Sequence, residues 1–163
     1  MITSRFSLIA LALAFVAGTT VAIAAAADIA FVGPSGWNHV APANADATRK
    51  FDQWKLNVGG SDPTETLTYV ADNSASYSDA LALVHKNFND NHIKPSVDDD
   101  TTCRGKQGHM IEFKSGPEGN SIIIDRMMVP QDPGLITITY ARGEKWPYDD
   151  DVKKSIDTFC KGT

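Results

Sequence analysis

Cysteine and histidine are scarce in this chain, and this limits the metal chemistry that the sequence can encode locally. It has only two cysteines, Cys103 and Cys160, and its four histidines fall at positions 39, 85, 92 and 109. No two histidines stand in an H-x-H or H-x-x-x-H spacing, and the two cysteines lie far apart, so no local chelate is present. We therefore expect no metal site and no cofactor.

Motifs for nucleophilic catalysis and phosphate binding are also missing. No G-x-S-x-G elbow occurs, and Gly59-Gly60 lacks the Lys and the helix start of a phosphate-binding loop. The remaining candidates for chemistry are two carboxylates on adjacent predicted strands, Glu112 and Asp125, which could serve as an acid and a base. The alternative is an ordinary ion pair with Lys114 or Arg126.

Basic residues are outnumbered by acidic ones. The chain has 15 Lys and Arg against 20 Asp and Glu, a net charge of −5, which argues against nonspecific binding to nucleic acid or anionic membranes. Two acidic runs, Asp98–Asp100 and Asp149–Asp151, lack the alternate spacing, central Gly and closing Glu of a Ca²⁺ loop. We interpret the first run as a solvated loop and the second as the start of a helix.

Long apolar runs are absent except near the start of the chain. The run from Phe6 to Ile23 follows a single positive charge and precedes small residues, ending in Ala25-Ala26-Ala27. This pattern is typical of a cleavable signal peptide over residues 1–27. The alternative, a retained membrane anchor, is disfavoured by Gly18, Thr19 and Thr20 inside the run. We expect a secreted or periplasmic protein with no stable membrane insertion after cleavage.

Export changes the interpretation of the two cysteines. An even pair in an oxidising compartment predicts a disulfide between Cys103 and Cys160. Two free, buried thiols are the alternative.

The rest of the chain predicts one α+β domain over residues 49–163, preceded by an irregular arm over 28–48. Period-two apolar patterns indicate strands and 3.6-residue patterns indicate helices. Short connections favour a largely antiparallel sheet with helices on its faces. The expected elements are a hairpin (51–58 and 64–71), a helix capped by Ser76 or Ser78 (77–89), a three-strand meander (109–114, 121–129 and 135–142) and a helix capped by Asp150 or Asp151 (151–159).

The meander also predicts a strand register. Tight turns suggest that Ser115 pairs with Asn120 and that Val129 pairs with Leu135, which would place Met110 opposite Asp125. In this register one core face carries Ile111, Phe113, Ile136, Ile138 and Tyr140, and Thr137 and Thr139 lie on the other.

The order of these elements resembles the PsbP-like α/β/α sandwich superfamily, which includes extrinsic photosystem II subunits and many small exported bacterial proteins. The residues that carry the resemblance are Gly36-Trp37, the helix Ser78–Phe88, Gly105-x-x-Gly108-x-x-x-Glu112-Phe113, and Ser155-Ile156-x-x-Phe159. The resemblance implies a non-enzymatic binding or accessory fold. It assigns no functional residue here.

The most accessible candidate for a binding surface is an aromatic loop before the last helix. Lys145, Trp146 and Tyr148 lie in it, and aromatic side chains on loops are common anchors at interfaces. The alternative is that Trp146 or Tyr148 packs on the final helix, while Trp37 and Trp54 are expected in the core.

We therefore expect a non-catalytic binding or accessory protein of the periplasm or cell envelope, with a protein or small-ligand partner and no nucleic acid. The alternatives are a small secreted hydrolase using Glu112 and Asp125, and a carrier of a small apolar ligand bound between helix and sheet.

Overall fold

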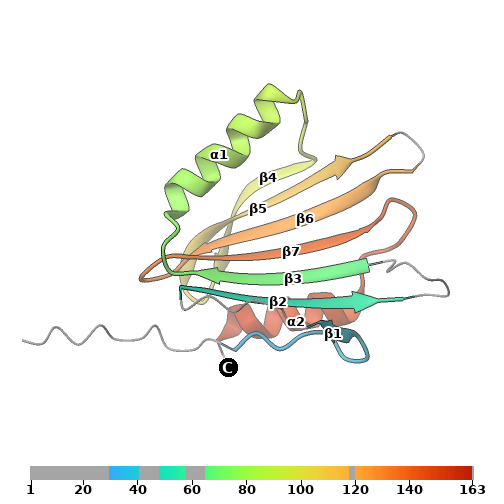
Figure 1. Ribbon diagram of the computed structural model, residues 1–163, viewed down its shortest axis with the longest axis horizontal. Coiled ribbons are helices and arrows are strands. Elements are labelled where there is room, and N and C mark those ends of the chain that lie inside the picture. Colours follow the sequence, from blue (N-terminus) through green and yellow to red (C-terminus); the bar gives the residue numbers. More distant parts are fainter. Residues whose placement is uncertain (1–29, 41–47, 58–64, 118–119, 163) are drawn as a thin grey trace, which may run out of the picture.

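The computed structural model describes residues 30–40, 48–57, 65–117 and 120–162 (Figure 1). The predicted signal peptide, residues 1–27, lies outside this part of the chain. One 7-stranded sheet runs through the described residues in the order β1-β2-β3-β7-β6-β5-β4, and every neighbouring pair is antiparallel. The elements are β1 (Asn38–Val40), β2 (Arg49–Leu56), β3 (Glu65–Asp72), α1 (Tyr77–Asp90), β4 (Val97–Cys103), β5 (Lys106–Ser115), β6 (Ile122–Pro130), β7 (Leu135–Gly143) and α2 (Asp150–Lys161).

The predicted α+β class is therefore confirmed, and β4 is the main addition. The sequence predicted a solvated loop at Asp98–Asp100, but these residues lie in β4 at the edge of the sheet. β4 and β5 are joined by Arg104 and Gly105, which both have positive φ, as a two-residue type I′ hairpin requires. Because charged side chains are common on exposed edge strands, three consecutive acids are compatible with a strand at this position.

The predicted register of the meander was wrong in both hairpins. Glu112, not Met110, lies opposite Asp125, and Ser115 pairs with Ile122. In the next hairpin Val129 pairs with Ile136. This second shift is a single residue, so it moves every side chain of β7 to the other face.

The two helices cover opposite faces of the sheet, and Figure 1 shows α1 beside β4 and β5, with α2 across the sheet from it. In α1, the Ser76 hydroxyl accepts a hydrogen bond from the Asp79 amide, as predicted for a cap. The cap of α2 is Asp149, one residue earlier than expected, whose carboxylate accepts a hydrogen bond from the Val152 amide at 2.9 Å.

The larger core lies between α2 and the sheet. Val152, Ile156 and Phe159 of α2 are buried against a layer from β2, β3, β6 and β7. The N-terminal segment completes this core, because Phe31 and Trp37 are both buried in it. Trp37 and Trp54 are thus core residues, as predicted. The smaller core lies under α1 and contains Phe88, Ile111 and Phe113.

The predicted disulfide between Cys103 and Cys160 is present and joins the end of β4 to the last turn of α2. The Arg104 amide also donates a hydrogen bond to the Cys160 carbonyl at 2.7 Å. The edge of the sheet and the end of α2 are therefore fixed to each other.

On the α1 side of the sheet, the part that α1 does not reach is only partly covered within the described residues. Thr68 of β3 and Thr139 of β7 lie side by side on it, and Arg126 of β6 follows in the same row. All three are half-buried. The Nε of Arg126 is buried and has no hydrogen-bond partner among the described residues, and burial lowers the pKa of this guanidinium.

Candidate functional site

A groove of about 490 Å³ lies between α2 and the strands β4, β5 and β6. Its floor is formed by Met110 and Met127, and Ile156 of α2 forms one wall. Thr101 lies on the β4 side. The groove exists because α2 crosses over the middle of the sheet, and the disulfide holds its last turn against β4.

Charged groups of α2 line the mouth of the groove, above this apolar floor. They are Asp150, Lys153 and Asp157, which all lie on exposed positions of the helix. The next residue, Lys154, does not line this groove. It lines a different hollow, together with Val32 and Ser35. A ligand with an apolar body and a polar end would therefore find complementary groups in the groove.

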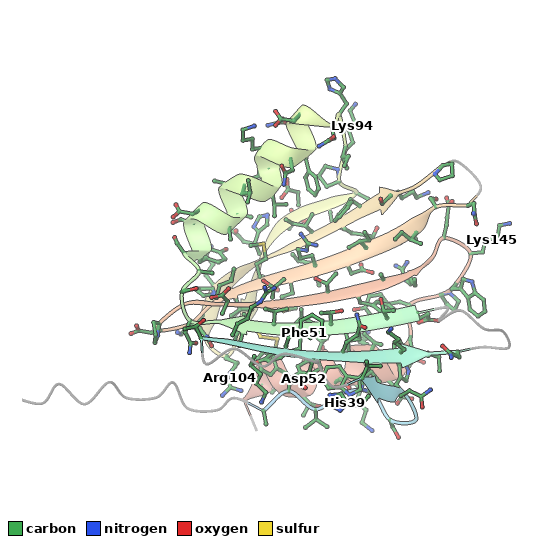
Figure 2. The ribbon with its side chains drawn as sticks, viewed as in Figure 1. His39, Phe51, Asp52, Lys94, Arg104 and Lys145 are labelled. Carbon is green, nitrogen blue, oxygen red and sulfur yellow. A yellow bond between two sulfur atoms is a disulfide. The ribbon has the colours of Figure 1, made fainter. Side chains whose placement is uncertain are left out.

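The structure separates the three residues of the predicted aromatic loop. Tyr148 turns inward and lines the groove, with its ring 4.9 Å from that of Tyr140. Trp146 remains 37% exposed, and Lys145 extends away from the sheet at the edge of the molecule (Figure 2). The packing alternative thus holds for Tyr148, whereas Trp146 and Lys145 stay accessible.

A charge cluster lies behind Tyr148, in which Asp125 and Arg142 are buried and the Glu112 side chain is 29% exposed. Arg142 of β7 approaches the carboxylates of Glu112 and Asp125, each at 3.5 Å, and its guanidinium lies 5.4 Å from the centre of the Tyr148 ring. The Oδ2 atom of Asp125 has no hydrogen-bond donor within the described residues. Burial, opposed by Arg142 and assisted by the hydrogen bond with Glu112, raises the pKa of Asp125 to about 6.

The pKa values of Glu112 and Asp125 are shifted in opposite directions, as in an acid–base pair. Neither carboxylate, however, is in contact with the groove. The Ser96 hydroxyl lies 2.6 Å from Glu112 and is the main cause of its lowered pKa, so the two carboxylates differ in proton affinity. Asp125 is also only 7% exposed. Burial and the charge of Asp125 raise the pKa of Tyr148, which stands between the pair and the groove. A ligand in the groove would therefore contact Tyr148 and not these two carboxylates.

A second buried pair lies at the same end of β7, on the side of the neighbouring strand β3. The Tyr140 hydroxyl donates a hydrogen bond to Glu65 and accepts one from the Asp149 amide. Burial raises the pKa of both Glu65 and Tyr140. This contact joins β3, β7 and the start of α2, and so it positions the helix that forms the groove.

The structure also brings together two histidines that are unrelated in sequence. His85 of α1 and His109 of β5 both direct Nε2 to Oδ1 of Asp98 in β4, at 3.1 and 2.6 Å. The other ring nitrogen of His109, Nδ1, lies 3.2 Å from Asp100. Burial lowers the pKa of His109, but the hydrogen bonds with the two aspartates outweigh it, so its net pKa is raised.

Sequence reasoning missed this cluster because its members come from three elements with no local spacing. The signal that was available is the alternation of Asp98 and Asp100 on one face of a strand, which places both beside His109 in the neighbouring strand. Because Asp98–Asp100 were interpreted as a loop, the shared face of Asp98 and Asp100 was not recognised.

Comparisons with known proteins provide little further information. The sequence matches no known family and no curated protein. Among solved structures, the chain is similar to the crystal structure of a Pseudomonas aeruginosa protein of unknown function. The two are 17% identical with a TM-score of 0.48, and the match covers 63% of this chain and 73% of that one. In the part of the chain that the structure describes, no helix is long and apolar enough for a membrane span.

Proposed function

We propose that this chain is an exported, non-catalytic binding protein that holds a small molecule in the groove between α2 and the sheet. The observation that carries the proposal is the groove itself. Its volume of about 490 Å³ falls within the usual range of roughly 300–1,000 Å³ for ligand sites. An apolar floor with a few polar groups at the mouth is the usual composition of such sites.

The lining residues favour a ligand with an apolar body. Met110 and Met127 lie side by side on neighbouring strands, and methionine side chains adapt to ligands of irregular shape. Lys153 is the cation among the lining residues, so it is the natural partner for an acidic end group. We therefore propose an amphipathic, weakly acidic ligand, such as a molecule with one carboxylate on an alkyl or aromatic body.

Export is part of the same proposal. The signal-peptide pattern of residues 1–27 supports it, and a disulfide is typical of proteins in oxidising compartments. The resemblance to the PsbP-like superfamily agrees with a binding role and remains a prediction.

The test is a fluorescence titration of the mature, disulfide-bonded protein with 1-anilinonaphthalene-8-sulfonate, an anionic, largely aromatic probe. Thr101→Trp places a bulky side chain in the groove, and Thr102→Trp is its control, because Thr102 lies on the same strand and does not line the groove. We expect saturable binding of the probe by the wild type and by the control, and at least tenfold weaker binding by Thr101→Trp.

A second pair of variants tests the charge without adding bulk. Lys153→Glu should weaken binding of the anionic probe, whereas Lys154→Glu should leave it unchanged, because only Lys153 lines the groove. Both residues are exposed, so neither variant should alter the fold. Equal affinities in all five proteins, or no saturable binding by the wild type, would overturn the proposal.

A protein partner at Trp146 and Lys145 is the second candidate, favoured by the exposure of the Trp146 ring. Crosslinking in the native envelope separates the two functions. Loss of a crosslinked protein in Trp146→Ala, with probe binding intact, would support the partner surface. An unchanged crosslinking pattern would refute it.

A further inference from the structure

We propose that His85, Asp98 and His109 form a binding site for a transition-metal dication of the Zn²⁺ or Cu²⁺ class. The three side chains come from α1, β4 and β5, and each offers one donor atom within 4.8 Å of the other two. The site is on the face of the sheet opposite the groove, so the inference is independent of the proposed function.

The donor set determines the class of metal. Two imidazole nitrogens and one carboxylate oxygen suit Zn²⁺, Cu²⁺ and Ni²⁺, whereas Ca²⁺ and Mg²⁺ prefer oxygen ligands throughout. Cys103 and Cys160 are joined to each other and offer no thiolate. Three protein ligands with further positions left for water is a common arrangement for zinc.

The present geometry is close to what such an ion requires. With bonds of about 2.0–2.1 Å around a tetrahedral ion, donor atoms lie roughly 3.3 Å apart. The observed separations between Nε2 and Oδ1 are 3.1 Å for His85 and 2.6 Å for His109, and the two Nε2 atoms lie within 4.8 Å of each other. Binding therefore requires Oδ1 to move away from the His109 ring and the three donors to close around the ion. The side chains of His85 and Asp98 are 40% and 38% exposed, which leaves them room to adjust and gives an ion access.

Asp100 supplies the outer support that metal-binding histidines usually have. Its Oδ1 lies 3.2 Å from Nδ1 of His109, and its Oδ2 accepts a hydrogen bond from Gln107 at 2.8 Å. When Nδ1–H is donated to Asp100, the lone pair of Nε2 is directed at Oδ1 of Asp98. The lone pairs of Nε2 and of Oδ1 then face each other at 2.6 Å and repel. A proton or a metal ion between the two atoms removes this repulsion.

This inference departs from the expectation that the chain has no metal site. That expectation considered only ligands that lie close together in the sequence. Here the long α1 crossover and the β4–β5 hairpin bring the ligands together from separate elements.

The primary test is isothermal titration of the tag-free, disulfide-bonded protein with Zn²⁺ and, separately, with Cu²⁺. We expect one equivalent to bind, with affinity at least tenfold weaker in His85→Ala and in Asp98→Asn. His39→Ala is the matched control. His39 lies 3.0 Å from Asp52 (Figure 2) and so forms one histidine–carboxylate pair without a second histidine. The His39→Ala variant should bind Zn²⁺ and Cu²⁺ with the same affinity as the wild type.

Nitrogen NMR of the imidazole rings provides a readout that does not depend on stability. Zn²⁺ should shift Nε2 of His85 and His109 while Nδ1 of His109 stays protonated toward Asp100. Asp100→Asn should weaken binding about 10–100-fold, the usual effect of removing an outer carboxylate. Absence of metal binding by the wild type, or equal binding by the wild type, His85→Ala and Asp98→Asn, would overturn the inference. So would loss of binding in His39→Ala.

Discussion

Removal of the disulfide gives the most quantitative prediction about stability. Cys103 and Cys160 are 57 residues apart in sequence, and a crosslink that closes a loop of this size stabilises by about 4 kcal/mol in the chain-entropy model. Replacing both residues by Ala should therefore lower the free energy of unfolding by about 4 kcal/mol. For a domain of this size, that corresponds to a fall in melting temperature on the order of 15 °C.

Urea unfolding followed by tryptophan fluorescence measures this effect, because Trp37 and Trp54 are buried in the core beside α2. The denaturant dependence should also become steeper, since an unfolded chain without the crosslink exposes more surface. Wild-type protein with its disulfide reduced is the control for the cavity that alanine leaves at the buried Cys103. A loss below about 1 kcal/mol, with no change in steepness, would refute the reasoning.

Two further predictions concern the charges buried in the sheet. Because the pKa of Asp125 rises from 3.8 to about 6 on folding, its ionisation opposes folding as the pH rises through this interval. Relative to wild type, Asp125→Asn should thus gain up to about 3 kcal/mol of stability between acidic and neutral pH in urea unfolding; a pH-independent difference would contradict this. Arg126→Met should leave the melting temperature unchanged or raise it, because the Nε of Arg126 is buried without a partner among the described residues. Arg142→Met should lower the free energy of unfolding by about 3 kcal/mol or more, because it removes the cation with which Glu112 and Asp125 pair. Equal losses in the two variants would contradict the second prediction.

The elements were largely predictable from the sequence because their patterns are local. The cap at Ser76 and the apolar stripe that contains Phe88 were sufficient for α1. The hairpin of β2 and β3 followed from the alternation in each strand, whereas the pairing of Trp54 with Leu67 is known from the structure. The disulfide followed from the compartment, since only two cysteines are present.

The register and the sites were not predictable in the same way. A shift of one residue between β6 and β7 leaves the apolar content of each strand unchanged, yet it moves Ile138 to the α2 side and Thr139 to the α1 side. The pairing of Glu112 with Asp125 depended on the same kind of detail. The groove is formed by the crossing of α2 over the sheet, a tertiary feature with no local pattern.

Native mass spectrometry of the protein recovered from its own envelope tests the central claim, ligand binding in the groove, most directly. We predict that the wild type and Thr102→Trp carry a small molecule that is released on denaturation, and that Thr101→Trp is recovered without it. Folded wild type and Thr101→Trp with the same mass, free of any bound molecule or carrying the same one, would contradict the account.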